Sequence, residues 1–252
     1  MNVDVYAVCY NEELFLPYFL RHYERFARSI TVFDNNSTDA SPEIIKNHPL
    51  CSFIPFNALN GFIREELTFI KNECWKGSDA DWVVVCDVDE LLYYPNIKYL
   101  FENLQGRYSV WQPQAYTMLT QDEPYHDGQV WEIYDEGVRT PFYDKCIVFD
   151  PKEVIMNYTD NGHGCNPQPE VAIFNDSDLR LLHYRCMGLQ YTQERFKILK
   201  ERIGKREKWA DYSNPQKFFQ QFFRHKRPCV PPLDNKQLIH INWIDENVSL
   251  ES

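Results

Sequence analysis

The sequence predicts an α/β fold in which a mostly parallel sheet is flanked by helices. Short apolar segments rich in β-branched residues predict strands at 3–9, 29–33 and 82–86. Amphipathic helical patterns at 14–26 and 62–75 lie between them. Strands that alternate with helices form parallel βαβ units, so we expect these strands to share one sheet.

The first predicted strand ends at Cys9 and is followed by Tyr10 and Asn11. We expect Asn11 to be the N-cap of the first helix, because an asparagine side chain accepts hydrogen bonds from the free N–H groups of a first turn. The chain does not begin with a basic stretch followed by an apolar one, so no signal peptide is predicted.

The second predicted strand leads into a polar run at 34–39, whose composition is typical of a turn. A short helix is expected from Ser41 to about Lys46, and residues 51–55 are expected to form a third strand. Asp34 stands at the carboxyl end of its strand, where open α/β sheets bind ligands. An ordinary turn without a ligand is the alternative interpretation.

Arg64 lies in the first turn of the helix predicted at 62–75. A cation is unfavourable there because the helix dipole is positive at its N-terminus, which indicates that Arg64 faces an anion. The alternative is a surface arginine that pairs with a neighbouring glutamate.

The stretch 82–90 is the strongest candidate for a functional site. A strand that is apolar on both faces ends in three carboxylates, those of Asp87, Asp89 and Glu90. If the backbone stays extended, Asp87 and Asp89 point to the same side. Mg²⁺ or Mn²⁺ would relieve their repulsion and could hold a phosphate as well. A solvated acidic turn is the alternative.

The middle of the chain predicts further elements of the same domain. We expect a turn and a short helix at 91–104, a strand at 109–118 and a buried strand at 146–149. The loops at 120–128 and 160–165 are candidates for acceptor or catalytic groups, because long loops between core elements commonly carry them.

His183 closes a further apolar run. A neutral imidazole is a good ligand for Mn²⁺, so His183 could complete a metal site begun by Asp89. A hydrogen-bonded core histidine is the alternative, and it applies equally to His163 in the loop at 160–165.

Two C-terminal helices are predicted at 191–209 and 215–225, the first of them strongly basic. We expect both to pack their aromatic faces on the sheet and to expose their charges. The alternative is a basic platform for phosphorylated acceptors, or for peripheral contact with an anionic membrane surface.

Composition narrows the classes of function. The chain has 252 residues and a net charge of −11, which argues against broad nucleic-acid binding. No apolar run is long enough for a transmembrane segment. Eight cysteines without a CxxC pair predict buried thiols rather than structural zinc or a disulfide framework. We therefore expect a soluble, cytoplasmic protein.

With these motifs in place, the sequence resembles the nucleotide-sugar glycosyltransferases of the GT-A fold, of the family-2-like group and the related family-92-like proteins. Four stretches in the first hundred residues and one later stretch carry the resemblance: 9–12, 34–39, Arg64, 87–90 and 182–185. Their order along the chain and their positions at strand ends make the set specific.

The resemblance implies a Rossmann-like, nucleotide-binding GT-A domain over 1–188. Its nucleotide-binding half would span about 1–105 and its acceptor half about 106–188. Residues 189–252 would form a helical extension packed on the same domain.

The resemblance also implies which residues bind the nucleotide-sugar. Asp34 would hydrogen-bond the nucleotide, while Tyr10 and Asn11 would line the base pocket. Arg64 would approach the base or the diphosphate. Asp87 would face the ribose.

A metal, Mn²⁺ or Mg²⁺, is implied at the DxD motif. Asp89 would bind it, with Asp87 and His183 as further ligands. The general base for inversion is not mapped by the resemblance, because the glutamate–aspartate pair before the usual Gln-Arg-Trp motif is absent. The candidates are Asp122, Glu123 and Asp160.

The activity implied is a metal-dependent, inverting hexosyl- or pentosyltransferase that acts in glycan biosynthesis. It would move a sugar from a nucleoside diphosphate, with UDP as the expected nucleotide, to a hydroxyl of a glycan or glycoconjugate. A nucleotidyltransferase that acts on a sugar phosphate and a catalytically inactive nucleotide-sugar-binding module are the alternatives.

Overall fold

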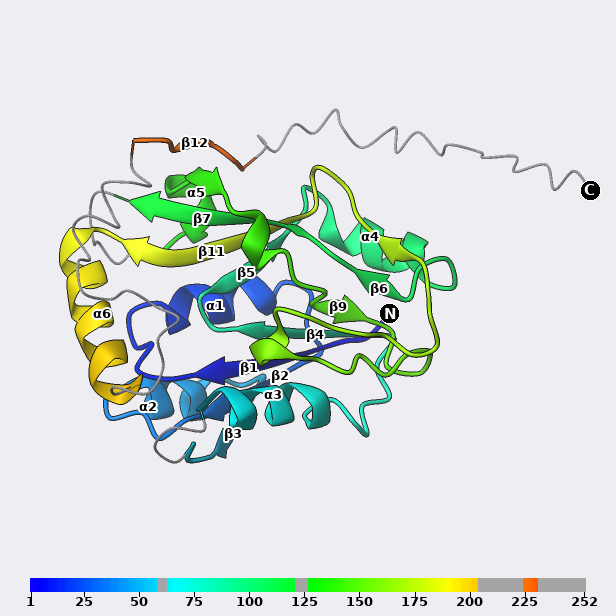
Figure 1. Cartoon of the computed structure of the whole chain (residues 1–252), viewed down its shortest axis with the longest axis horizontal. Helices are drawn as coiled ribbons and strands as arrows, with labels where there is room; N and C mark the ends of the chain where they lie inside the picture. Colours follow the sequence, from blue (N-terminus) through cyan, green and yellow to red (C-terminus); the bar gives the residue numbers. More distant parts are fainter. Residues whose placement is uncertain (59–62, 121–126, 204–223, 231–252) are drawn as a thin grey trace, which may run out of the picture.

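The computed structural model of the chain describes residues 1–58, 63–120, 127–203 and 224–230, with the backbone alone at 63 and 199–203. Residues 204–209 of the predicted basic helix and 215–223 of the second predicted helix therefore lie outside the described residues. The described part is built on two mixed sheets with helices packed around them (Figure 1).

The first sheet has seven strands in the order β10-β6-β9-β4-β1-β2-β3. The strands β4, β1, β2 and β3 are parallel neighbours, and only the short β9 runs antiparallel to both of its neighbours. The expectation of a mostly parallel sheet is confirmed. Its strands are β1 (Val3–Cys9), β2 (Ser29–Asp34), β3 (Cys51–Pro55), β4 (Trp82–Asp87), β6 (Val110–Trp111), β9 (Val148–Phe149) and β10 (Ile173–Phe174).

The second sheet has five strands in the order β12-β8-β7-β11-β5. Within it, β11 runs parallel to β7 and antiparallel to β5. Because β5 begins only two residues after β4 ends, the turn between them joins the two sheets. The strands are β5 (Glu90–Tyr93), β7 (Gln114–Thr120), β8 (Glu136–Arg139), β11 (Arg180–Met187) and β12 (Arg227–Pro228).

The prediction of a single strand at 109–118 is wrong. The chain forms β6, crosses Pro113 and enters the second sheet as β7. Proline has no N–H to donate to a ladder, so it interrupts the strand and allows the chain to change sheets. The prediction for 91–104 also missed a strand, because β5 precedes the helix there.

The helices pack on both sheets. They are α1 (Leu16–Tyr23), α2 (Ser41–Asn47), α3 (Ile63–Glu73), α4 (Ile97–Leu104), α5 (Val130–Ile133) and α6 (Leu189–Ile203), with 3₁₀ turns η1 (Pro141–Tyr143) and η2 (Asp160–Gly162). Among the described residues, no helix is long and apolar enough to cross a membrane. The arrowheads of β1, β7 and β11 point towards α6 (Figure 1).

The expected N-cap at Asn11 is wrong. Helix α1 begins five residues later, at Leu16, and Pro17 occupies its first turn. Asn11 instead has a φ of 50°, a left-handed conformation that asparagine tolerates better than most residues. The residue serves a turn, not a helix end.

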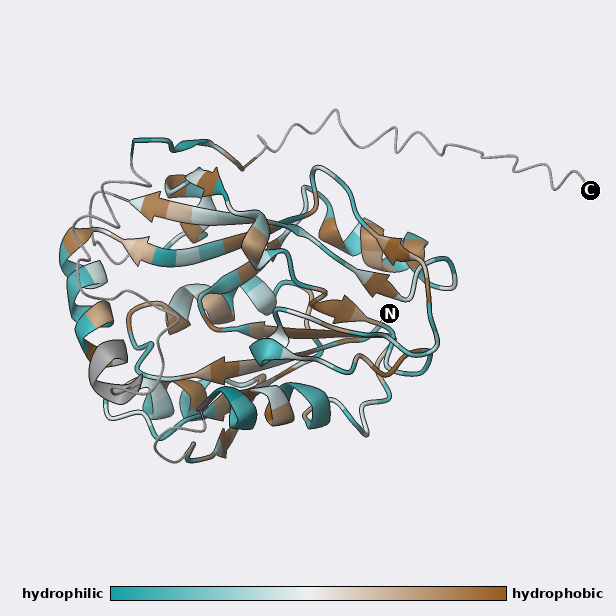
Figure 2. Ribbon diagram, in the orientation of Figure 1, coloured by the Kyte–Doolittle hydropathy of each residue, from teal (hydrophilic) through white to brown (hydrophobic). Residues whose placement is uncertain are grey.

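Strand β4 is buried on both faces, as the apolar run predicted. Trp82 and Val84 pack in one hydrophobic cluster with α1 and α4, whereas Val83 and Val85 pack in another with Trp75, which follows α3. Alternate side chains of a strand point to opposite faces, so one strand supports both clusters. Figure 2 shows the hydrophobic colouring along β4, β1 and β9.

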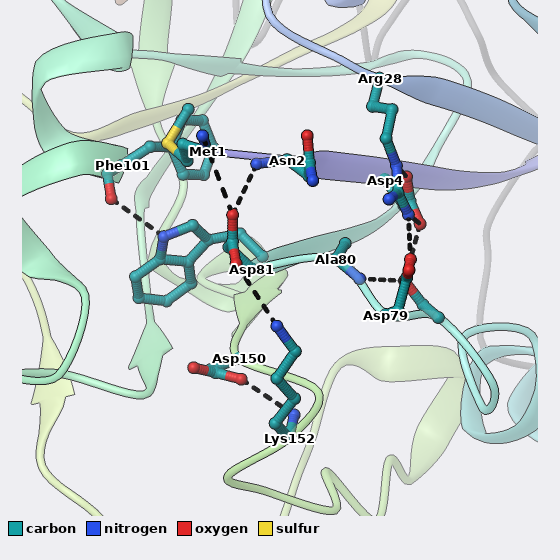
Figure 3. Close-up of polar contacts among 12 residues, drawn as sticks. Met1, Asn2, Asp4, Arg28, Asp79, Ala80, Asp81, Phe101, Asp150 and Lys152 are labelled. Carbon is teal, nitrogen blue, oxygen red and sulfur yellow. Dashed lines mark hydrogen bonds and ion pairs between the residues drawn. The ribbon is translucent and has the colours of Figure 1, made fainter.

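The amino ends of β1 and β4 are held by charged side chains. Arg28 donates to the carboxylates of Asp4 and Asp79, at 2.7 Å from each, and the backbone N–H of Asn2 donates to Asp81 (Figure 3). These contacts fix the edge of the sheet that lies opposite the strand ends with Asp34 and Asp87.

We expect Trp111→Ala to lower the free energy of unfolding by about 3–5 kcal/mol, because truncation of a buried aromatic side chain leaves a cavity. Trp111 is fully buried, and its ring lies 4.7 Å from that of Phe101 and 4.8 Å from that of Trp82. Urea denaturation measures the loss. Phe69→Ala is the control, since Phe69 is 63% exposed. Equal loss in both variants would contradict this description of the core.

Candidate functional site

The candidate site lies at the carboxyl ends of three parallel strands. In the sheet register Cys9 of β1 is opposite Asp34 of β2, and Val8 is opposite Asp87 of β4. The two aspartates therefore flank the end of β1, which lies between β4 and β2. Ligands of open α/β sheets bind at this edge.

Hydrogen bonds join the loop after β1 to the loop after β2. The backbone N–H of Asn11 donates to Ser37 Oγ, and the N–H of Thr38 donates to Asn11 Oδ1, both at 2.8 Å. The N–H of Glu12 donates to Ser41 Oγ at the same distance. The left-handed turn at Asn11 makes these contacts possible, and the two loops form one surface.

Asp34 is buried beneath this surface. Its Oδ2 accepts a hydrogen bond from the backbone N–H of Ser37 at 3.0 Å. Within the described part of the chain its Oδ1 is buried without a hydrogen-bond partner. A buried carboxylate oxygen without a donor is costly, so a ligand that supplies an N–H or O–H would stabilise the site.

Asp87 lies between two buried lysines. Its carboxylate accepts from Lys71 Nζ of α3 at 2.7 Å and from Lys145 Nζ at 3.1 Å. Lys145 also donates to Glu90 at 2.6 Å, and the other Glu90 oxygen accepts the backbone N–H of Asp87 at 3.1 Å. Burial disfavours the ionised form of Asp87, but the charges of Lys145 and Lys71 outweigh it and lower its pKa.

This arrangement corrects the expectation of an extended acidic stretch. The strand ends at Asp87 and a turn follows, so Asp87 and Asp89 turn to different partners. Two ammonium groups balance the carboxylates of Asp87 and Glu90. The sequence predicted that a metal would balance the charge of Asp87. In the structure Lys71 and Lys145, which are distant in sequence, balance it.

Asp89 faces β11. Its Oδ2 lies 3.2 Å from His183 Nε2, and its backbone carbonyl accepts the N–H of Tyr184 at 2.8 Å. Burial would raise the pKa of Asp89, but the charge and hydrogen bond of His183 outweigh this effect and lower it to about 2. The carboxylate is therefore ionised throughout the neutral range.

Asp89 and His183 are the best donors for a divalent cation. Among the described residues no group of three or more His, Cys, Asp and Glu side chains converges to hold a metal. A carboxylate with an imidazole nitrogen is a suitable partial donor set for Mn²⁺ or Mg²⁺ when substrate oxygens and water supply the remaining ligands.

Arg64 does face an anion, namely the carboxylate of Asp160 in η2, with which it forms an ion pair. The two other base candidates, Asp122 and Glu123, lie outside the described residues. The same ion pair lines one end of a groove of about 600 Å³ along the outer side of α3, which Phe69 also lines.

A comparison with protein families identifies the family of this chain. The family model described as "Glycosyl transferase family 2" matches residues 4–159, which is more than half of the chain. The chain belongs to this family. The matched segment includes β1, β2 and β4 with Asp34, Asp87 and Asp89, but ends before His183.

Solved structures similar to this glycosyltransferase are distant. TarS of S. aureus, residues 1–349, is 12% identical to this chain, with a TM-score of 0.44. The match covers 89% of this chain and 71% of the TarS chain. The bifunctional IspDF of Campylobacter jejuni is 14% identical, with a TM-score of 0.41 and coverage of 73% and 53%. HddC of Yersinia pseudotuberculosis is 16% identical, with a TM-score of 0.39 and coverage of 69% and 89%. No curated protein matches the chain.

In the candidate site of this glycosyltransferase, one arginine that the sequence did not single out binds the loop after β1. Arg195 of α6 donates to the backbone carbonyls of Tyr10 and Asn11, at 2.7 and 3.1 Å, and forms an ion pair with the buried Glu12. Burial raises the pKa of Glu12 to about 8, although Arg195 opposes the shift. An arginine within a basic helix gave no signal that distinguished it from its exposed neighbours.

Lys71 and Lys145 were missed as members of the site for a similar reason. Lys71 belongs to the amphipathic α3, where a lysine normally lies on the solvent face, but its side chain is buried. Lys145 precedes a buried segment, and this position was the only signal in the sequence.

We expect Lys145→Met to lower the stability of the glycosyltransferase by about 3–5 kcal/mol, because it leaves the fully buried Glu90 without its counter-charge. The double variant Lys145→Met/Glu90→Gln should recover part of the loss. Urea denaturation of both variants measures the two losses. A double variant that is no more stable than Lys145→Met would contradict this role of Lys145.

Proposed function

We propose that the chain transfers a sugar from a nucleoside-diphosphate sugar, with UDP as the nucleotide, to a hydroxyl of a glycan or glycoconjugate with inversion at the anomeric carbon. One observation carries this proposal: Asp89 and His183 lie together at the strand edge that also holds Asp34 and the lysine-paired Asp87. Membership of glycosyl transferase family 2 supports the reaction class.

In this proposal the loop surface after β1 and β2 binds the nucleoside. Tyr10 and Asn11 line the base pocket, and the unpaired oxygen of Asp34 accepts a hydrogen bond from the base. Asp87 accepts hydrogen bonds from the ribose hydroxyls. Its two lysine contacts keep it ionised, and an ionised carboxylate is a stronger acceptor than a protonated one.

The proposal assigns Mn²⁺ or Mg²⁺ to Asp89 and His183. The ion, when bound, would stabilise the negative charge that develops on the departing diphosphate. Asp89 is ionised at neutral pH and His183 is held in place by β11, so both donors are positioned before the donor substrate arrives. Asp87 is not assigned as a direct ligand, because the ammonium groups of Lys71 and Lys145 beside its carboxylate repel a cation.

The proposed general base is Asp122 or Glu123. Asp160, the third candidate, is ion-paired with Arg64 and lines the α3 groove, so it is the weaker assignment. A base must reach the acceptor hydroxyl whose proton it removes.

The proposed domain organisation keeps residues 1–188 as one catalytic domain, with the nucleotide bound by about 1–105 and the acceptor by about 106–188. The contacts of Arg195 with the loop after β1 support packing of the 189–252 extension on this domain, through α6. The proposal includes action in the cytoplasm, where the cysteines stay reduced.

Asp89→Ala should lower the rate of donor hydrolysis and transfer by about 100-fold or more, because it removes charge stabilisation of the leaving group. The assay incubates the full chain with Mn²⁺ and a panel of UDP-, GDP- and dTDP-sugars, and chromatography measures the released nucleotide. Asp81→Asn is the control, since Asp81 lies at the opposite edge of the sheet.

The same assay separates the alternatives. Nucleotidyl transfer from UTP or CTP to a sugar 1-phosphate, without use of nucleotide-sugars, would favour the nucleotidyltransferase. Metal-dependent binding of a nucleotide-sugar in a thermal-shift assay, without product, would favour an inactive binding module. If neither nucleotides nor nucleotide-sugars shift the melting temperature in the presence of metal, the proposed function is wrong.

Arg195→Lys should raise the KM for the nucleotide-sugar by about tenfold and change kcat less, because an ammonium group cannot replace the arginine fork that binds the loop. Steady-state kinetics measures both constants. A matched substitution, Lys197→Arg, alters an exposed residue of the same helix and should leave them unchanged. A fall in kcat alone would argue against a role for Arg195 in ordering the nucleotide loop.

A further inference from the structure

Three aromatic side chains form a surface beside the candidate site. We call Phe142, Tyr143 and His163 the aromatic ledge. The ring of His163 lies 5.3 Å from that of Phe142 at an interplanar angle of 32°, and 5.5 Å from that of Tyr143. Phe142 and Tyr143 belong to η1, and His163 follows η2, so the ledge unites two loops distant in sequence.

The ledge is continuous with the proposed reaction centre. The ring of Tyr143 meets that of His183 edge-on at 5.0 Å, and His183 contacts Asp89. Arg185, two residues further along β11, donates to the hydroxyl of Tyr143 at 3.0 Å. A molecule that lies on the ledge would therefore be next to the Asp89–His183 pair.

The segment that carries the ledge is tightly fixed. The backbone N–H of Thr140 donates to the carbonyl of Ala115 at 2.9 Å, and Asp144 accepts the N–H of Ala115 at 2.8 Å. Arg139 donates to the same carboxylate at 2.7 Å. Both ends of η1 are thus bound to β7, and a surface held in one conformation loses little entropy when it binds a ligand.

Phe142 is exposed to an unusual degree for an aromatic residue on a fixed segment. Its side chain is 71% exposed, so it contributes little to the core. An exposed aromatic ring next to a candidate active site is typical of a recognition surface.

We propose that the aromatic ledge is the acceptor subsite and that it binds a neutral pyranose ring by stacking on Phe142. This inference rests on the proposed function and names its acceptor class. The C–H groups on one face of a pyranose carry partial positive charge and pack against the negative face of an aromatic ring. With its net charge of −11, the chain repels polyanionic acceptors, which favours an uncharged sugar.

Binding of neutral sugars to the full chain tests the proposal without turnover. Saturation-transfer NMR with maltose, cellobiose, lactose and chitobiose, in the presence of UDP and Mg²⁺, measures contact with the pyranose C–H groups. Phe142→Ala should weaken binding of the recognised disaccharide by about tenfold, the loss of one stacking contact. Phe142→Trp should retain it, and Phe69→Ala, a change of equal size at the α3 groove, should leave it unchanged.

Kinetics gives a second readout once a donor is known. Phe142→Ala should raise the KM for the disaccharide acceptor and leave donor hydrolysis in its absence unchanged. Because Phe142 is exposed, the melting temperature of the Phe142→Ala variant should match that of the unaltered chain.

Several results would overturn the inference. The first is that Phe142→Ala binds the disaccharide as tightly as the unaltered chain does, and the second is that no disaccharide in the panel binds. The third is that Phe69→Ala weakens disaccharide binding instead, which would place the acceptor in the α3 groove. Preferential binding of glucose 1-phosphate would overturn the choice of a neutral sugar. If the unaltered chain binds no UDP in a separate thermal-shift assay, the proposed function is wrong. If it binds UDP but Phe142→Ala binds the disaccharide as well as the unaltered chain does, only the assignment of the ledge is wrong.

Discussion

The buried ion cluster at the end of β4 is the interaction on which the site depends. Asp87 and Glu90 could not both remain ionised in this position without Lys71 and Lys145, because a buried charge without a partner is strongly destabilising. The cluster draws together α3, the turn after β4 and the segment that precedes β9. Because Glu90 is the first residue of β5, the cluster also links the two sheets, and it holds the orientation of Asp87.

A second set of contacts organises the opposite side of the site. Arg195 of α6 binds the loop after β1 through two backbone carbonyls and the carboxylate of Glu12. The same loop is hydrogen-bonded to the loop after β2 through Asn11. The proposed nucleotide pocket is therefore built from three segments, and the C-terminal helix is part of its support.

The sequence predicted the first sheet well but not the second. The strand that contains Val84 is a nearly continuous apolar run, and runs of this kind are typical of buried parallel strands. The division at Pro113 was missed, because a single proline within an apolar segment does not reveal that the chain enters another sheet. Asn11 was misassigned since the same residue type is favoured both at helix N-caps and in left-handed turns.

The sequence by itself determined that acidic side chains would stand at the ends of parallel strands, because strand polarity and hydrophobic pattern are local properties. It also paired Asp89 with His183 as a hypothesis, and the two are neighbours in the structure. Only the tertiary structure decided which charges balance Asp87, since the lysines come from distant segments. The same holds for the aromatic ledge: whether an aromatic ring is buried or exposed depends on what packs against it, which no local pattern contains.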